Sequence, residues 1–227
     1  MSASPQVKSK QRVAAHGEVF TAEREVKAMC DLVADECNRI DSRFLEPACG
    51  DGNFLAEVLS RKLATCQKKY GMPLLRPEYE RASVNAVMSV YGVELLPDNA
   101  QACRERLFTI WNQDYSRVCA SAANEQCREV VKYIFAKNIL CGDALTMKQA
   151  DGTPIIFAEW SFIDGSLVKR RDFRLDQLIN CDSENKKDQL SFNGLSGLEY
   201  DPEQHCYIPT PIREYPPIDY RRLCEHA

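Results

Sequence analysis

The chain of 227 residues lacks several features that would assign it quickly to a class. It has no apolar run near the roughly 20 residues that a membrane-spanning helix needs, and its first residues have no apolar core typical of a secretory signal. A basic excess is also missing, since 29 Lys and Arg face 33 Asp and Glu, giving a formal net charge of −4. These absences predict a cytoplasmic protein without a membrane anchor, and they give no support to a strongly basic nucleic-acid binder.

Several metal-binding and catalytic patterns are absent too. No two of the 11 cysteines are spaced as Cys-x-x-Cys, and the three histidines lie far apart, so no metal site is expected. The odd number of cysteines argues against a complete disulfide framework, and reduced thiols are expected. The sequence contains no Gly-x-Ser-x-Gly of a hydrolase and no Gly-x-x-x-x-Gly-Lys-Ser/Thr of a phosphate-binding loop.

The apolar residues that are present switch between helical and strand spacing along the chain. Strands that alternate with helices predict an α/β protein with a Rossmann-like parallel sheet flanked by helices, incomplete on its C-terminal side. Thr21 is expected to cap the first helix. The expected strands are 43–46, 89–95, 138–141 and 154–162, and the expected helices are 21–39, 54–69, 78–87, 125–137, a short one over 173–179 and one starting at 97.

Composition divides the chain into three predicted regions. Residues 1–15 are basic and poor in apolar residues, which predicts a flexible tail. Residues 16–180 are expected to form one α/β domain, and 181–227 a polar loop followed by a proline-rich, extended segment. Within the second region, Asp164-Gly165 is a hairpin turn signal, so the residues after it are expected to return antiparallel.

One turn contains an unusual set of residues. Residues 44–55 read FLEPACGDGNFL, in which Gly50 and Gly52 permit positive φ angles and close backbone approach. The helix that follows Asn53 points its free amides at the turn, which favours a carboxylate or phosphate there. Glu46, at the strand end, would repel a phosphate and suits a cationic or hydrogen-donating group. The turn therefore favours a ligand with both an amine and a carboxylate.

The next two expected strands also end in acidic residues. Glu94 ends the second strand, where nucleotide-binding α/β folds place the acid that accepts ribose hydroxyls. Asp143 ends the third strand and, with Ala144 beside it, can hold an adenine amino group and cover the ring. Each residue alone also has a structural interpretation, as an exposed acid or a helix cap. In chain order, however, they match the amino-acid, ribose and adenine parts of S-adenosylmethionine.

On these residues the chain resembles the amino-methylating DNA methyltransferases, especially the bacterial adenine methylases of restriction-modification systems. Residues 45–55 resemble their first cofactor motif, and residues 16–21 (HGEVFT) resemble the segment that closes over the cofactor, with Ala22 where a proline is expected. Residues 93–95 and 141–145 resemble the ribose and adenine motifs. The resemblance covers roughly residues 16–162 and implies S-adenosylmethionine as cofactor and DNA as the substrate.

The turns and the resemblance together define a predicted cofactor site at the carboxyl ends of the strands. Its members are Phe20, Thr21, Glu46, Pro47, Ala48, Cys49, Gly50, Asp51, Gly52, Asn53, Phe54, Glu94, Leu95, Asp143 and Ala144.

The catalytic tetrapeptide of that family, Asn/Asp-Pro-Pro-Tyr/Phe at the end of the fourth strand, does not occur. At the corresponding place stand Glu159, Trp160, Ser161 and Phe162. They are either a variant catalytic motif, with Glu159 accepting from the target amino group and Phe162 stacking on a flipped base, or ordinary residues of a hairpin. The Pro-Cys dipeptide of cytosine-ring methylation is absent as well.

Two functions remain open from the sequence. The first is a methyltransferase that modifies the exocyclic amino group of adenine in DNA. The second is a non-catalytic or split subunit that binds the cofactor and docks on a partner chain, which would supply target recognition or the missing strands of the sheet. The short stretch after Phe162, too short for the rest of a seven-stranded sheet, leaves room for the second.

Overall fold

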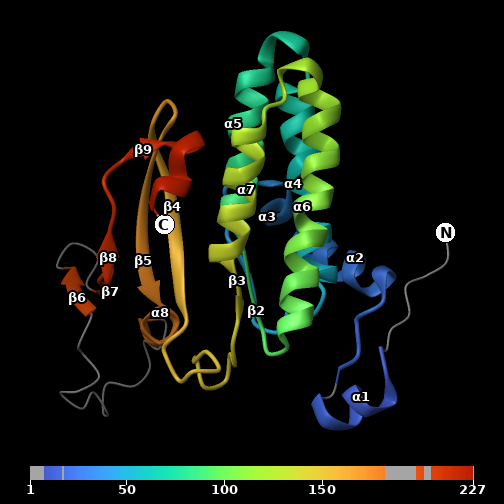
Figure 1. Cartoon of the computed structure of the whole chain (residues 1–227), viewed down its shortest axis with the longest axis vertical. Helices are drawn as coiled ribbons and strands as arrows, with labels where there is room; N and C mark the ends of the chain where they lie inside the picture. The colour runs from blue at the N-terminus through green and yellow to red at the C-terminus, as the bar shows by residue number, and fades with distance from the viewer. Residues whose placement is uncertain (1–7, 17, 182–197, 202–205, 227) are drawn as a thin grey trace. The chain divides into compact units, whose positions relative to one another are not determined.

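The computed structural model of the chain describes residues 8–16, 18–181, 198–201 and 206–226 (Figure 1). These residues fall into two compact units, unit 1 over Met1–Ala144 and unit 2 over Leu145–Ala227. The boundary lies inside the range 16–180, which was predicted to be one domain, because the strand that starts at Ile156 belongs to a different sheet from the first three. Among the described residues, no helix combines the length and the apolar composition needed to cross a membrane.

Unit 1 contains a three-stranded parallel sheet in the order β1-β2-β3. Parallel neighbours need crossover connections, and helices provide them here between β1 and β2 and between β2 and β3. Every residue of β2 is buried, as expected for the central strand of a covered parallel sheet. The predicted α/β class is therefore confirmed, and the sheet is compatible with a Rossmann-like fold. The strands are β1 (Phe44–Glu46), β2 (Val90–Glu94) and β3 (Ile139–Cys141).

Long helices flank this sheet (Figure 1). The predicted helix over 21–39 is interrupted at Val33, and it begins after Ala22 without a side-chain cap, so the prediction of Thr21 as the cap is wrong. The predicted tail also contains a helix, α1. The helices of unit 1 are α1 (Lys10–His16), α2 (Glu23–Leu32), α3 (Ala34–Asn38), α4 (Asn53–Tyr70), α5 (Arg76–Met88), α6 (Pro97–Cys119) and α7 (Glu125–Asn138), with short 3-10 helices η1 (Pro73–Leu75) and η2 (Ala120–Ala122).

Buried aromatic residues join the helices α5 and α6. Trp111 and Tyr115 stack with ring centroids 4.5 Å apart. Their polar atoms stay satisfied, since Trp111 Nε1 donates to Ser83 Oγ at 3.2 Å and the Tyr115 hydroxyl donates to Glu80 Oε2 at 2.6 Å. These contacts fix the crossover helices α5 and α6 against each other.

A buried lysine fixes the start of β1. Lys62 of α4 is 0% exposed, and its Nζ donates to the carbonyl oxygens of Arg39, Ile40 and Ser42 at 2.8, 3.2 and 2.5 Å. The same ammonium group lies 5.2 Å from the centroid of the Phe44 ring. Burial lowers the pKa of Lys62 to about 8. The segment that leads into β1 therefore depends on one side chain from α4.

Unit 2 is built from antiparallel pairs. The strands β4 and β5 form the hairpin predicted from Asp164-Gly165, and Gly165 has a φ of +48°. The predicted polar loop lies largely in 182–197, outside the described residues, and the proline-rich segment forms short strands that include β8 and β9, both paired with β5. The elements are β4 (Ile156–Asp164), β5 (Leu167–Arg174), α8 (Leu175–Cys181), β6 (Leu198–Asp201), β7 (Cys206–Pro209), β8 (Arg213–Glu214), β9 (Ile218–Asp219) and the 3-10 helix η4 (Tyr220–His226).

Candidate cofactor site

The carboxyl ends of β1, β2 and β3 bring the three predicted turns to one edge of the sheet. The N–H of Cys49, in the turn after β1, donates to the Val93 carbonyl at 2.9 Å. The N–H of Gly142, after β3, donates to the Glu94 carbonyl, also at 2.9 Å. Both outer turns are thus tied to the end of β2, at the edge where open parallel sheets bind ligands.

The turn after β1 needs glycine at both predicted positions. Gly50 and Gly52 have φ angles of +55° and +87°, which residues with side chains rarely adopt. A Cβ atom on Gly52 would lie 2.7 Å from Cys103 Sγ, and one on Gly50 would lie 3.1 Å from Phe20 Cε1. The chain therefore passes close to both α6 and the Phe20 segment before α4 begins at Asn53.

Gly52→Ala is expected to lower the free energy of unfolding by about 3 kcal/mol, because positive-φ strain adds to a clash with Cys103. Gly165→Ala is the matched control: its φ is +48° but nothing lies within 4 Å of the added Cβ, so about 1 kcal/mol is expected. In a double-mutant cycle measured by urea unfolding, adding Cys103→Ala should relieve the clash and restore that part of the lost stability. The part due to positive-φ strain should remain. Equal losses in the two glycine variants would contradict the close approach to α6.

Glu94 joins the glycine turn to the start of α6. The residue is 8% exposed. Its Oε2 accepts from the Gly50 N–H at 2.9 Å, and its Oε1 accepts from the Leu96 N–H at 2.9 Å. A carboxylate offers about four acceptor positions, so these bonds leave capacity for ligand hydroxyl groups. Leu95, predicted beside it, is exposed.

Two acidic side chains near the turn favour a hydrogen-donating group. Burial raises the pKa of Glu46, and the backbone amide of Ala48 opposes that rise. Asp51 Oδ1 is buried without a hydrogen-bond donor among the described residues, although it forms a 3.4 Å ion pair with Arg106. An amine would compensate the Glu46 carboxylate, whereas a phosphate beside it would add repulsion. This acceptor therefore fits the amine of an amino-acid group, such as that of S-adenosylmethionine, better than it fits a nucleotide phosphate.

The Phe20-Thr21 segment contacts the glycine turn and the start of α4, while its closure over a cofactor stays a prediction. Asn53 Nδ2 donates to the Thr21 carbonyl at 3.2 Å, and Arg106 Nη1 donates to Asn53 Oδ1 at 2.5 Å. Asn53 thus uses both ends of its amide to tie the segment to α4 and α6. Arg106 was missed in the sequence because a single arginine on a long helix carries no motif.

Other predicted members of the site have packing roles in this structure. Cys49 is buried against Gly92, where a Cβ would lie 2.8 Å from Cys49 Sγ, and a hydrogen bond with Cys103 together with burial raises the pKa of its thiol. The Phe54 ring packs against that of Phe44 on β1, with ring centroids 6.4 Å apart. Of the remaining predicted members, Pro47 and Ala48 after β1 are exposed, and Asp143 and Ala144 after β3 are half-buried.

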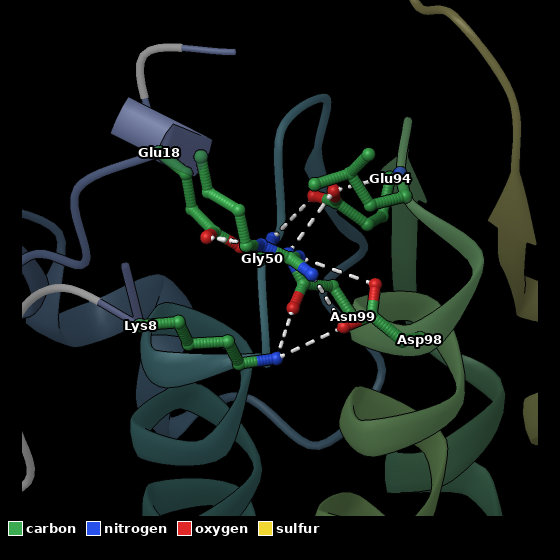
Figure 2. Close-up of polar contacts among 8 residues, drawn as sticks. Lys8, Glu18, Gly50, Glu94, Asp98 and Asn99 are labelled. Carbon is green, nitrogen blue, oxygen red and sulfur yellow. Dashed lines mark hydrogen bonds and ion pairs between the residues drawn. The ribbon is translucent and has the colours of Figure 1, made fainter. Parts of the chain in front are cut away.

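Charged residues before α2 reach the same edge, which the sequence did not predict (Figure 2). Arg12 Nε and Nη2 donate to the two oxygens of Glu18 at 2.6 and 2.7 Å, and its Nη1 donates to Asp98 at 2.8 Å. Hydrogen bonding from Arg12 lowers the pKa of Asp98 to about 2. Residues 8–15, for which composition predicts a flexible tail, thus have fixed contacts, because Arg12 pairs with nearby Glu18 and with Asp98, 86 positions away.

The tetrapeptide at 159–162 lies in unit 2 and not in the parallel sheet. Its strand β4 pairs antiparallel with β5, with Glu159 opposite Arg171. Glu159 Oε2 accepts from Arg171 Nε at 2.7 Å. The expectation of a fourth parallel strand is therefore wrong, because the Asp164-Gly165 turn lets the chain reverse and pair locally.

The aromatic residues of the tetrapeptide pack within unit 2. Trp160 is 5% exposed, and the guanidinium of Arg170 lies 5.5 Å from its ring centroid. Phe162 contacts Tyr220 edge-to-face with ring centroids 5.8 Å apart, and Ser161, which lies between the two aromatic residues in sequence, is half-buried. Of the two interpretations left open by the sequence, the hairpin describes the backbone, while a catalytic role stays a prediction.

No group of three or more His, Cys, Asp or Glu within the described ranges could hold a metal ion. Comparisons with protein-family models, with curated proteins and with solved structures found no match to this chain. Its functional assignment therefore depends on the residues and contacts described above.

Proposed function

We propose that the chain is an S-adenosylmethionine-dependent methyltransferase that modifies the exocyclic amino group of adenine in DNA. The observation that supports this proposal is the convergence of the double-glycine turn, Glu46 and Glu94 at one edge of a parallel sheet. Glu46 would take the amine, the N-terminus of α4 the carboxylate, Glu94 the ribose hydroxyls and Asp143 the adenine amino group.

Bound S-adenosylmethionine would supply an electrophilic methyl group. The residues of unit 1 bind and orient it: Phe20 covers Gly50, and Asn53 holds the Phe20-Thr21 segment in place. Fixing the donor in one orientation is the main contribution that such a site makes, because alignment of two reactants removes much of the entropic barrier.

A second candidate is a non-catalytic or split subunit whose catalytic residues come from a partner chain. The observation that favours it is that side chains of the tetrapeptide at 159–162 already have partners within unit 2. Glu159 is ion-paired with Arg171, and Trp160 is buried against Arg170. A partner would then align the target amino group and recognise the DNA, while this chain holds the cofactor.

Transfer of labelled methyl groups to DNA by the isolated chain separates the candidates. We expect transfer by the wild type and a loss of about 100-fold in Glu159→Ala, the scale of one positioned acid-base group. Asp151→Ala, an exposed acid of the same unit, is the control and should transfer normally. Equal rates for wild type and Glu159→Ala would remove Glu159 from catalysis, and cofactor binding without any transfer would favour the second candidate.

A further inference from the structure

The buried side-chain amide of Asn99 connects the carboxylates of Glu18 and Glu94 at the edge of the parallel sheet where the strands end (Figure 2). Asn99, in the first turn of α6, is 1% exposed. Its Nδ2 donates to Glu18 Oε1 at 2.6 Å and lies 3.4 Å from Glu94 Oε1, and its Oδ1 accepts from Lys8 Nζ at 2.5 Å. One side chain therefore touches an acid from the segment before α2, the acid that ends β2 and a lysine before α1.

Only one orientation of this amide satisfies its neighbours. With Nδ2 toward the carboxylates, both N–H groups find acceptors and Oδ1 finds an ammonium donor. Turned by 180°, Oδ1 would face carboxylate oxygens and the NH₂ would face Lys8, leaving every contact repulsive. Aspartate at this position would have the same shape but no N–H to donate. The two acids thus require an amide specifically.

The charge of Glu18 is balanced outside the amide by Arg12, which contacts both its oxygens. Glu94 instead accepts from backbone N–H groups of Gly50 and Leu96. The amide is the side-chain link between these two carboxylates. The charged groups around it are Lys8, Arg12, Glu18, Glu94 and Asp98.

We propose that Asn99 is a positioning residue for the cofactor, which with Glu18 and Arg12 forms a relay that holds the Glu94 carboxylate toward the ribose hydroxyls. This inference rests on the proposed ribose contact of Glu94. Asn99 itself need not touch the ligand: it restrains Oε1, while the Gly50 and Leu96 amides restrain the carboxylate from the turn and from α6. A carboxylate held on three sides loses little entropy when a ligand arrives.

Asn99→Asp tests the relay through its pH dependence. At pH 8 the new carboxylate would repel Glu18 and Glu94, so calorimetry with S-adenosylmethionine should give a Kd at least 10-fold above that of the wild type. At pH 5.5 the new carboxyl can hold a proton and donate it as the amide did. The ratio of the Asn99→Asp Kd to the wild-type Kd should therefore be less than half its value at pH 8. Lost packing or a weakened helix would leave that ratio unchanged.

Three further variants make the test specific. Asn99→Ala removes the donor without adding a carboxyl, and its Kd ratio to the wild type should not change with pH. Asn112→Asp is the same substitution on the same helix away from this edge, where the amide oxygen accepts from Arg128 Nε at 2.8 Å, and it should bind like the wild type. Arg12→Met, at the part-exposed outer end of the relay, should still fold and should weaken binding three- to tenfold.

The outcomes separate this inference from the proposed function. The positioning role alone would be overturned if the wild type binds S-adenosylmethionine and Asn99→Asp binds it with the same Kd at pH 8. It would also be overturned if the ratio of the Asn99→Asp Kd to the wild-type Kd does not change with pH. Absence of heat from the folded wild type would overturn the proposed function and the ribose role of the relay with it. Urea unfolding of the ligand-free chains at both pH values gives an independent readout, since the stability deficit of Asn99→Asp should also shrink at pH 5.5.

Discussion

Replacing Glu94 with alanine is expected to weaken binding of S-adenosylmethionine about 100-fold, or about 2.8 kcal/mol. The carboxylate is the proposed acceptor for the ribose hydroxyls, and it also receives the N–H groups of Gly50 and Leu96. Without it, the glycine turn loses its connection to the start of α6, so the ligand contact and the shape of the turn are lost together. Isothermal titration calorimetry at a temperature where the variant remains folded measures the effect.

Two variants control for the loss of an acid and for the loss of shape. Glu105→Ala removes an exposed carboxylate farther along α6 and should bind like the wild type. Glu94→Gln keeps one acceptor oxygen and should fall between wild type and Glu94→Ala. If Glu94→Ala binds with the wild-type Kd, the ribose contact is disproved.

Lys62→Met is expected to lower the free energy of unfolding by about 3 kcal/mol, the scale of losing one partner of a buried charged group. Methionine matches the lysine in length, but it offers no donor to the carbonyls of Arg39, Ile40 and Ser42. Urea unfolding followed by circular dichroism measures the difference. Lys69→Met, an exposed lysine in the last turn of the same helix, should cost less than about 1 kcal/mol.

The pH dependence gives Lys62 a second test. Its pKa is about 8 in the folded chain and 10.5 for an ordinary lysine, so between these values the unfolded chain binds more protons. Stability from this group therefore rises with pH across that window. The stability difference between wild type and Lys62→Met should widen from pH 8 to pH 10. A difference that is constant, or a loss no larger than that of Lys69→Met, would contradict the buried role.

The elements of unit 1 could be predicted well from the sequence because their signals are local. The strand that ends at Glu94 is an apolar run between a helix and a proline, and the glycines at 50 and 52 stand in a turn that uses their positive φ angles. The order of these turns at the edge of the sheet follows from the general geometry of parallel sheets. Thus the placement of Glu46, Gly50, Gly52 and Glu94 at this edge could be predicted from local sequence patterns, while their ligand remains a prediction.

The polar contacts around that site could not be found in the same way. Arg12 pairs with Asp98, which lies 86 positions later in the sequence, and nothing in the local sequence around either residue identifies its partner. Asn99 follows a proline and an aspartate and has the pattern of an ordinary first-turn residue. Lys62 did carry a signal, because it interrupts the apolar stripe of α4 beside Leu59 and Leu63, and a charge at a buried position implies partners.

The division into two units was missed for a different reason. The run from Pro154 to Phe162 is apolar enough for a parallel strand, and periodicity cannot separate that from one half of a hairpin. The turn at Asp164-Gly165 pointed to the hairpin, but the family resemblance placed the strand in the parallel sheet. Local turn chemistry was the better guide, because it acts within a few residues.

The proposed cofactor site is tested most directly by titrating the wild-type chain with S-adenosylmethionine and, separately, with ATP in a calorimeter. Both ligands carry adenosine, but only the first has an α-amino group for Glu46, whereas the second brings phosphates to a turn flanked by Glu46 and Asp51. We expect saturable heat at one site per chain with S-adenosylmethionine and at least 10-fold weaker binding of ATP. No heat with S-adenosylmethionine, or tighter binding of ATP, would contradict the proposed site.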